Sequence, residues 1–104
     1  MLPKRNRADR KLVAFIFKEG RFINSPSYSF KFIKIGGKES RISVIVPKSV
    51  SKSAVKRNKL RRLGYSAIAK HPSGLAGALI FKKYQDNLEI LKDEAQNIFS
   101  KINN

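Results

Sequence analysis

The stretch SKSAVKRNKLRRLGYSAIAK, residues 51–70, predicts the long helix around which the rest of this chain is organised. On a helical projection its apolar residues gather in one narrow stripe, which comprises Leu60, Leu63, Gly64 and Ala67. A separate row follows at i, i+4 and i+8 and comprises Arg57, Arg61 and Tyr65, with Asn58 and Arg62 beside it. We therefore expect a helix that packs on a sheet through the stripe and points an array of hydrogen-bond donors outward.

The outward row is unfavourable in an isolated helix, because Arg57 and Arg61 are like charges at i, i+4, which cost about 0.2–0.5 kcal/mol. No acidic residue lies in the stretch to neutralise them. An extended polyanion gives a reason for such a row, since phosphate contacts release counterions and a planar guanidinium binds two phosphate oxygens at once. A solvated helix face without any partner is the plain alternative.

Length and composition indicate one small basic domain that spans residues 1–104. Lys and Arg number 23 against 7 Asp and Glu, which gives a formal net charge of +16. The charge is unevenly distributed, because no acid lies between Ser40 and Gln85. Self-repulsion of this size indicates a polyanionic partner, either nucleic acid or an anionic membrane surface.

Several function classes are excluded by what the sequence lacks. The absence of cysteine excludes a disulfide framework, a thiol nucleophile and a thiolate metal site, and it suits the reducing cytoplasm. The first eleven residues carry five basic residues and no apolar run of the kind that a signal peptide needs. No apolar run approaches the ~20 residues of a membrane span, so we expect a soluble cytoplasmic protein.

The N-terminal residues predict a basic arm followed by a short helix. The arm, residues 1–11, includes Lys4, Arg5 and Arg7 and has little that a core could bury. Asp9 is expected to cap a helix that ends at residue 17 or 18, before Gly20. Helical spacing alone favours Phe17 as a core residue of this helix.

Three further stretches predict strands. Residues 28–35, YSFKFIKI, alternate and predict a half-buried strand with the tyrosine and phenylalanine side chains on its buried face. After Gly36-Gly37, residues 41–47, RISVIVP, are β-branched on both faces and predict a more central strand that pairs with the first as a hairpin. Residues 76–84, AGALIFKKY, predict a third strand.

The ends of the long helix are also predicted. One of Ser49, Ser51 and Ser53 is expected to cap its start, and it should end by His71 because Pro72 follows. Gly64 within it predicts a close approach of the helix backbone to the sheet.

Residues 86–102 predict a last, mildly acidic amphipathic helix that lies away from the partner. The resulting order, α-β-β-α-β-α, predicts an α+β sandwich whose helices cover one face of a small sheet. No internal repeat or low-complexity segment is present.

Residues 46–62, VPKSVSKSAVKRNKLRR, resemble the protein subunit of bacterial ribonuclease P. The resemblance rests on the basic pairs and the residues before them, which are Arg57-Asn58, Arg61-Arg62, Ala54-Val55, Lys48 and Lys52. It runs from Leu2 to about Lys83, through LPKRNR near the start and IFKEGR at residues 16–21. The sequence departs from the family pattern where Tyr65 replaces an arginine, where Val13 replaces the first of two aromatics, and where the stretch before Ala54 is one residue longer and lacks the usual glycine.

The resemblance implies an accessory subunit of a ribonucleoprotein endonuclease. The catalytic RNA, with magnesium ions, would hydrolyse the bond between the 5′ leader and mature tRNA, and the protein would supply no catalytic residue and hold no metal alone. The fold implied has four strands and a left-handed β-α-β crossover, of the ribosomal protein S5 domain 2-like class, which is an exception to the usual handedness.

The resemblance also implies which residues meet RNA. Contacts to the catalytic RNA would come from Lys56, Arg57, Asn58, Lys59, Arg61, Arg62 and Tyr65. A cleft for the single-stranded leader would be lined by Val13, Phe17, Tyr28, Phe32, Lys48 and Lys52. The N-terminal arm would add Lys4, Arg5 and Arg7.

The residues themselves agree that catalysis by the polypeptide alone is not expected. A hydrolase needs a positioned acid and base or metal-binding carboxylates. The single histidine, His71, precedes Pro72 at a helix end and suggests a capping or surface residue, while Asp9, Glu19 and Glu39 are scattered.

Two alternatives share the charge and the small α+β design. A structural RNA-binding module such as a ribosomal protein is distinguished by the Arg-Asn motif together with the arm. A membrane-surface protein would need Lys and Arg beside a strongly amphipathic helix with Trp or Phe on its apolar face. The most basic helix here has instead a narrow apolar stripe of Leu, Gly and Ala.

Overall fold

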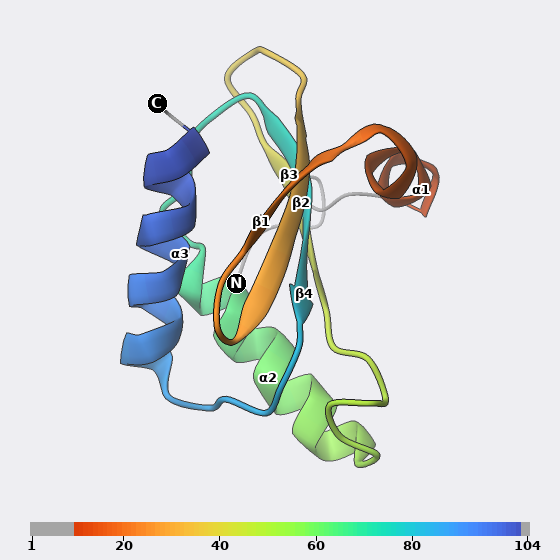
Figure 1. Cartoon of the computed structure of the whole chain (residues 1–104), viewed down its shortest axis with the longest axis vertical. Helices are drawn as coiled ribbons and strands as arrows, with labels where there is room; N and C mark the ends of the chain where they lie inside the picture. The colour runs from red at the N-terminus through yellow and green to blue at the C-terminus, as the bar shows by residue number, and fades with distance from the viewer. Residues whose placement is uncertain (1–9, 103–104) are drawn as a thin grey trace.

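The computed structural model describes residues 10–102, apart from the side chains of Arg10, Leu12 and Val13 (Figure 1). In this part of the chain the elements are α1 (Arg10–Glu19), β1 (Arg21–Asn24), β2 (Tyr28–Lys34), β3 (Arg41–Ile45), α2 (Ala54–Ala67), β4 (Leu75–Phe81) and α3 (Leu88–Ile102). The four strands form one mixed sheet, so the predicted α+β class and the four strands implied by the family resemblance are confirmed. The expected cap at Asp9 lies outside the described residues.

The first strand, β1, is the element that the residue pattern missed. It has only four residues, Arg21–Asn24, which are too few to show alternation. It pairs antiparallel with β2, with Arg21 opposite Phe32 and Asn24 opposite Ser29.

The strand order is β1-β2-β4-β3, and it contradicts the predicted hairpin between β2 and β3. β2 pairs antiparallel with β4, and β3 pairs parallel with the other side of β4. β3 is therefore an edge strand and not a central one. Its parallel pairing with β4 makes β3-α2-β4 a β-α-β unit, and the left hand of that crossover stays a prediction.

Backbone hydrogen bonds explain why β2 and β3 are separated. The Ile35 N–H donates to the Gly74 carbonyl at 2.8 Å, and the Gly74 N–H donates to the Glu39 carbonyl at 3.2 Å. The connection after β2 thus bonds to the turn that begins β4 and delivers β3 to the far side of that strand. These non-local bonds leave no mark on the alternation of either strand.

Helices cover both faces of the sheet, whereas the sequence predicted cover on one face only (Figure 1). α2 and α3 pack on the face that carries Tyr28, Phe30 and Phe32, and the main core lies there, as the alternation of β2 predicted. α1 packs against β2 and β4 from the opposite face, where Ile16 is completely buried.

The predicted features of α2 are largely confirmed. Ser53 caps the helix by accepting a hydrogen bond from the Lys56 N–H at 3.2 Å. A Cβ at Gly64 would lie 2.7 Å from a methyl carbon of Val44, so only glycine permits this approach to the sheet. After the helix, Nδ1 of His71 donates to the Ile68 carbonyl at 2.8 Å, in agreement with the expected capping residue.

Candidate RNA interface

The outer side of α2 carries five exposed polar or basic side chains. They are Lys56, Asn58, Lys59, Arg61 and Arg62, and we call them the α2 outer surface. Lys59 forms a 3.4 Å ion pair with Asp86 in which both side chains are about half exposed, which neutralises only a small part of the charge. The predicted outward array is present for these residues, and their contact with RNA stays a prediction.

Arg57 is only half exposed, and its guanidinium turns back toward the loop before the helix. Its Nη1 donates to the backbone carbonyls of Ser51 at 2.9 Å and Lys52 at 3.0 Å. This residue was predicted as an outward phosphate ligand. In the structure it holds the loop in place, so any phosphate contact would use its other guanidinium nitrogens.

Tyr65 was predicted to face outward and to contact RNA, and this placement is wrong. Its side chain is 5 % exposed, and its hydroxyl oxygen accepts a hydrogen bond from the Val44 N–H at 3.3 Å. Gly64, Ala67 and Ile68 are buried beside it, so the C-terminal half of α2 is covered over a wider arc than the apolar stripe predicted.

Tyr28 and Phe32 were predicted to line the leader cleft, and the structure places both in the main core instead. Tyr28 is completely buried, and its hydroxyl donates to the Leu91 carbonyl of α3. Burial, and secondarily the charge of Glu94, raise the pKa of the Tyr28 hydroxyl above its usual range. Phe32 is 5 % exposed and stacks on Phe30. The alternation of β2 was correctly interpreted, but these rings face α2 and α3 rather than α1.

The face of the sheet beside α1 exposes aromatic and basic side chains. Phe17 is 42 % exposed and Phe22 is 53 % exposed, so the expectation of Phe17 as a core residue is wrong. Lys31 lies opposite Phe22 in the β1–β2 pairing, and its Nζ lies 5.1 Å from the centre of the Phe17 ring. Phe22 was missed by sequence reasoning because β1 itself was missed.

A polar group continues this face beyond α1. The Ser29 hydroxyl donates to Oδ1 of Asn24 at 2.8 Å, and Nζ of Lys82 reaches the same oxygen at 3.5 Å. Together with Phe17, Phe22 and Lys31 these three residues form what we call the α1-side surface. Its two rings can stack on bases, and its two lysines and one amide can contact phosphates.

The remaining predicted contacts are dispersed. Lys48 and Lys52 are exposed in the loop between β3 and α2, the loop that Arg57 holds. The side chain of Val13 and the arm residues Lys4, Arg5 and Arg7 lie outside the described part of the chain.

Glu94 has an unexpected position for an acidic residue of the last helix. Its side chain is 8 % exposed and faces the turn between β1 and β2. Oε1 accepts hydrogen bonds from the Ser25 hydroxyl and, at 2.6 Å, from the Ser27 N–H, while Oε2 accepts one from the Ser27 hydroxyl at 2.6 Å. Burial alone would raise the pKa of Glu94, but these hydrogen bonds and the charge of Lys83 lower that pKa overall. The carboxylate thus ties α3 to the strand that carries Phe22.

Two further findings concern residues 10–102. No group of three or more His, Cys, Asp or Glu side chains is placed to hold a metal ion. No helix in this range is both long enough and apolar enough to cross a bilayer.

The family comparison accounts for nearly the whole sequence. The family model described as Ribonuclease P matches residues 2–102. The chain belongs to the ribonuclease P protein family. It is therefore the protein subunit of ribonuclease P, a tRNA-processing endoribonuclease, and it works with the RNA subunit of that enzyme. A comparison with curated proteins gives no match.

Solved ribonuclease P proteins share the fold. The Thermotoga maritima protein is 22 % identical, with a TM-score of 0.79 over 91 % of this chain and 96 % of that chain. The same protein in complex with 1-(4-fluorophenyl)-2-thiourea has a TM-score of 0.76, at 22 % identity over 97 % of this chain and 98 % of that one. The Staphylococcus aureus protein is 16 % identical, with a TM-score of 0.73 over 97 % of this chain and 92 % of that chain.

For a ribonuclease P protein, the arrangement separates two basic surfaces by one sheet. α2, which carries the α2 outer surface, lies on the side of the main core, and α1 lies on the opposite side of the sheet (Figure 1). The α1-side surface is on the face of the sheet that α1 covers. The two surfaces therefore share no side chain.

Proposed function

We propose that this ribonuclease P protein binds the RNA subunit through the α2 outer surface and the single-stranded 5′ leader of precursor tRNA through the α1-side surface. The observation that carries the proposal is the separation of two exposed basic surfaces on opposite faces of one sheet. The protein positions RNA on both faces of its sheet, and the RNA subunit breaks the phosphodiester bond between the 5′ leader and the mature tRNA.

At the α2 outer surface, Arg61 and Arg62 supply planar guanidinium groups and Asn58 supplies an amide from the same rigid helix. Guanidinium groups bind phosphate oxygens in pairs, and each contact releases counterions from the RNA. Because the helix is fixed by Gly64 against the sheet, these donors keep a constant spacing. Such a surface suits a folded RNA with its own fixed phosphate positions.

At the α1-side surface, the rings of Phe17 and Phe22 are exposed on either side of Lys31. Every base has a face on which an aromatic ring can stack, so this arrangement suits an unpaired strand with little dependence on sequence. Lys31 and Lys82 are placed to neutralise its phosphates. A paired acceptor stem would present no free base faces to these rings.

Magnesium enters this proposal through the RNA subunit. The described residues offer no cluster of carboxylates or histidines that fits a metal ion, so the ligands would be phosphate oxygens of the RNA. Bound there, magnesium would activate water and stabilise the leaving oxygen. The contribution of the polypeptide is to concentrate positive charge and orient the leader.

A reconstitution assay tests the proposal. Adding this protein to a bacterial ribonuclease P RNA at low magnesium should accelerate release of the 5′ leader from precursor tRNA, because bound cations replace part of the ionic requirement of the RNA. The measurement is single-turnover cleavage with and without the protein. RNA binding without any acceleration would instead favour a purely structural RNA-binding role.

Phe17→Ala should weaken binding of precursor tRNA to the reconstituted enzyme by about 1–3 kcal/mol, because a ring that stacks on a leader base is lost. Affinity for mature tRNA, which has no leader, should stay the same. Phe15→Ala is the matched control, since Phe15 is 50 % exposed on the same helix and is not part of the α1-side surface. Equal losses for precursor and mature tRNA would contradict the stacking role.

A further inference from the structure

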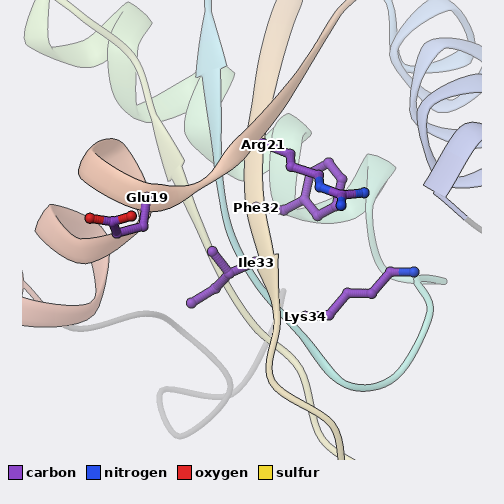
Figure 2. Close-up of a pocket in the computed structure, with 5 residues that line it drawn as sticks. All are labelled: Glu19, Arg21, Phe32, Ile33 and Lys34. Carbon is purple, nitrogen blue, oxygen red and sulfur yellow. The ribbon is translucent and has the colours of Figure 1, made fainter.

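A cavity opens at the β1 edge of the sheet, on the face of α2 and α3. Its volume is about 300 Å³, and its lining includes Arg21, Phe22, Phe32, Lys34, Lys101 and Ile102. We call it the edge cavity. A neighbouring cavity of about 260 Å³ shares Arg21, Phe32 and Lys34 with it (Figure 2).

The strand register explains why these side chains meet. Arg21 lies directly opposite Phe32 across the β1–β2 pair, so the two share one face of the sheet. Lys34 follows Phe32 by two residues and points to the same face. Figure 2 shows Arg21 and Lys34 on the same side of β2 as Phe32. Lys101, in the last turn of α3, supplies a third cation from a separate element.

The edge cavity has an unbalanced positive charge. Arg21, Lys34 and Lys101 are all exposed, and within residues 10–102 none of them forms an ion pair. Glu19 lines only the neighbouring cavity, and Figure 2 places its carboxylate on the opposite side of β2. Among the described residues the lining of the edge cavity holds these three cations and no acid, so the cations repel one another, and a phosphate between them would remove that repulsion.

The edge cavity also has an apolar floor. Phe32 is 5 % exposed and Ile102 is 6 % exposed, and both line the cavity. Apolar side chains do not stabilise an inorganic anion. A nucleotide carries a planar base that can pack on them as well as a phosphate that the cations can bind. A volume of about 300 Å³ lies at the small end of ligand sites and suits a single nucleotide.

We propose that the edge cavity binds one phosphate-bearing nucleotide of single-stranded RNA. The phosphate lies between Arg21, Lys34 and Lys101, and the base rests against the apolar floor of Phe32 and Ile102. This site is separate from the α2 outer surface and is centred on the opposite face of the sheet from the α1-side surface. Nucleotide binding in the edge cavity does not depend on whether the α1-side surface binds the leader.

Two RNA strands could supply this nucleotide. Phe22 lies opposite Lys31 at the α1-side surface and also lines the edge cavity, so a leader that passes Phe22 would reach the cavity with its more distant nucleotides. An unpaired segment of the RNA subunit offers the same chemistry. The two sources differ in whether binding depends on leader length.

The test uses the combined variant Arg21→Gln/Lys34→Gln/Lys101→Gln in the full-length protein. Its control is Lys38→Gln/Lys70→Gln/Lys92→Gln, which removes three exposed cations that line neither the edge cavity nor a surface named above. Dissociation constants are measured over a range of salt for the RNA subunit alone, and for precursors with leaders of about 4 and about 12 nucleotides in the reconstituted enzyme. Circular dichroism verifies that both variants fold. If the triple variant does not fold, Lys34→Gln and Lys101→Gln are measured singly.

The site variant should lose affinity on the order of tenfold relative to the control variant, and its salt slope should fall by about 0.7 for each phosphate contact removed. A loss confined to the long leader assigns the nucleotide to the leader, and a loss with the RNA subunit alone assigns it to that subunit. Equal affinities and slopes for the two variants on every RNA would overturn the proposal.

Discussion

Replacing Glu94 with alanine should lower the free energy of unfolding by about 3–5 kcal/mol, because three hydrogen-bond donors would lose their acceptor inside the protein. The donors are the Ser25 hydroxyl and the Ser27 hydroxyl and N–H, all of which bond to the Glu94 carboxylate. The substitution would also leave a void between α3 and the β1–β2 turn. Urea denaturation followed by circular dichroism measures the loss.

Two variants serve as controls for this prediction. Asp93→Ala removes an exposed carboxylate from the next position of α3 and should change the free energy of unfolding by less than about 0.5 kcal/mol. Glu94→Gln keeps the shape but turns an amide NH₂ toward one of the donors, so its loss should be intermediate. A loss for Glu94→Ala no larger than that for Asp93→Ala would show that the serines find other partners.

The same site predicts how stability depends on pH. Because the folded protein lowers the pKa of Glu94 below its unfolded value, the contribution of this carboxylate is complete above the unfolded pKa. It is lost as the pH falls through the folded pKa. Glu94→Gln should therefore show a weaker loss of stability in acid than the native protein. If the two proteins lost the same free energy of unfolding between neutral and acidic pH, Glu94 would not be the source of this pH dependence.

Local sequence patterns predicted most helices and strands of this fold correctly, but they did not predict which strands lie next to one another in the sheet. The inward face of β2 and the close approach at Gly64 follow from alternation and from the missing side chain, which are properties of single segments. The order β1-β2-β4-β3 depends on where the connection after β2 bonds, and those bonds join residues that are 35 to 39 positions apart. A local sequence pattern therefore cannot tell whether β3 pairs with β2 as a hairpin or whether β4 lies between the two strands.

The same distinction explains which predicted site residues were misplaced. Arg61 and Arg62 are exposed as predicted because helical periodicity sets the direction of each side chain over one or two turns. Tyr65 is buried because β3 contacts the C-terminal half of α2. The periodicity of the helix sequence gives no information about that contact. Tyr28 and Phe32 were assigned to the wrong surface because alternation separates two faces without saying which one α1 covers.

The combined variant Asn58→Ala/Arg61→Ala/Arg62→Ala should reduce affinity for the RNA subunit on the order of 100-fold at moderate salt, because two charged phosphate ligands and one neutral donor are lost together. The dependence of log affinity on log salt should fall by about two units, one for each arginine. Since all three side chains are exposed, the free energy of unfolding should hardly change.

Arg57→Ala should behave differently, because it removes the donor to the Ser51 and Lys52 carbonyls and so loosens the loop before α2. Filter binding over a salt series, paired with denaturation curves, separates the two cases. An unchanged salt slope in the triple variant would remove the α2 outer surface from the interface with the RNA subunit.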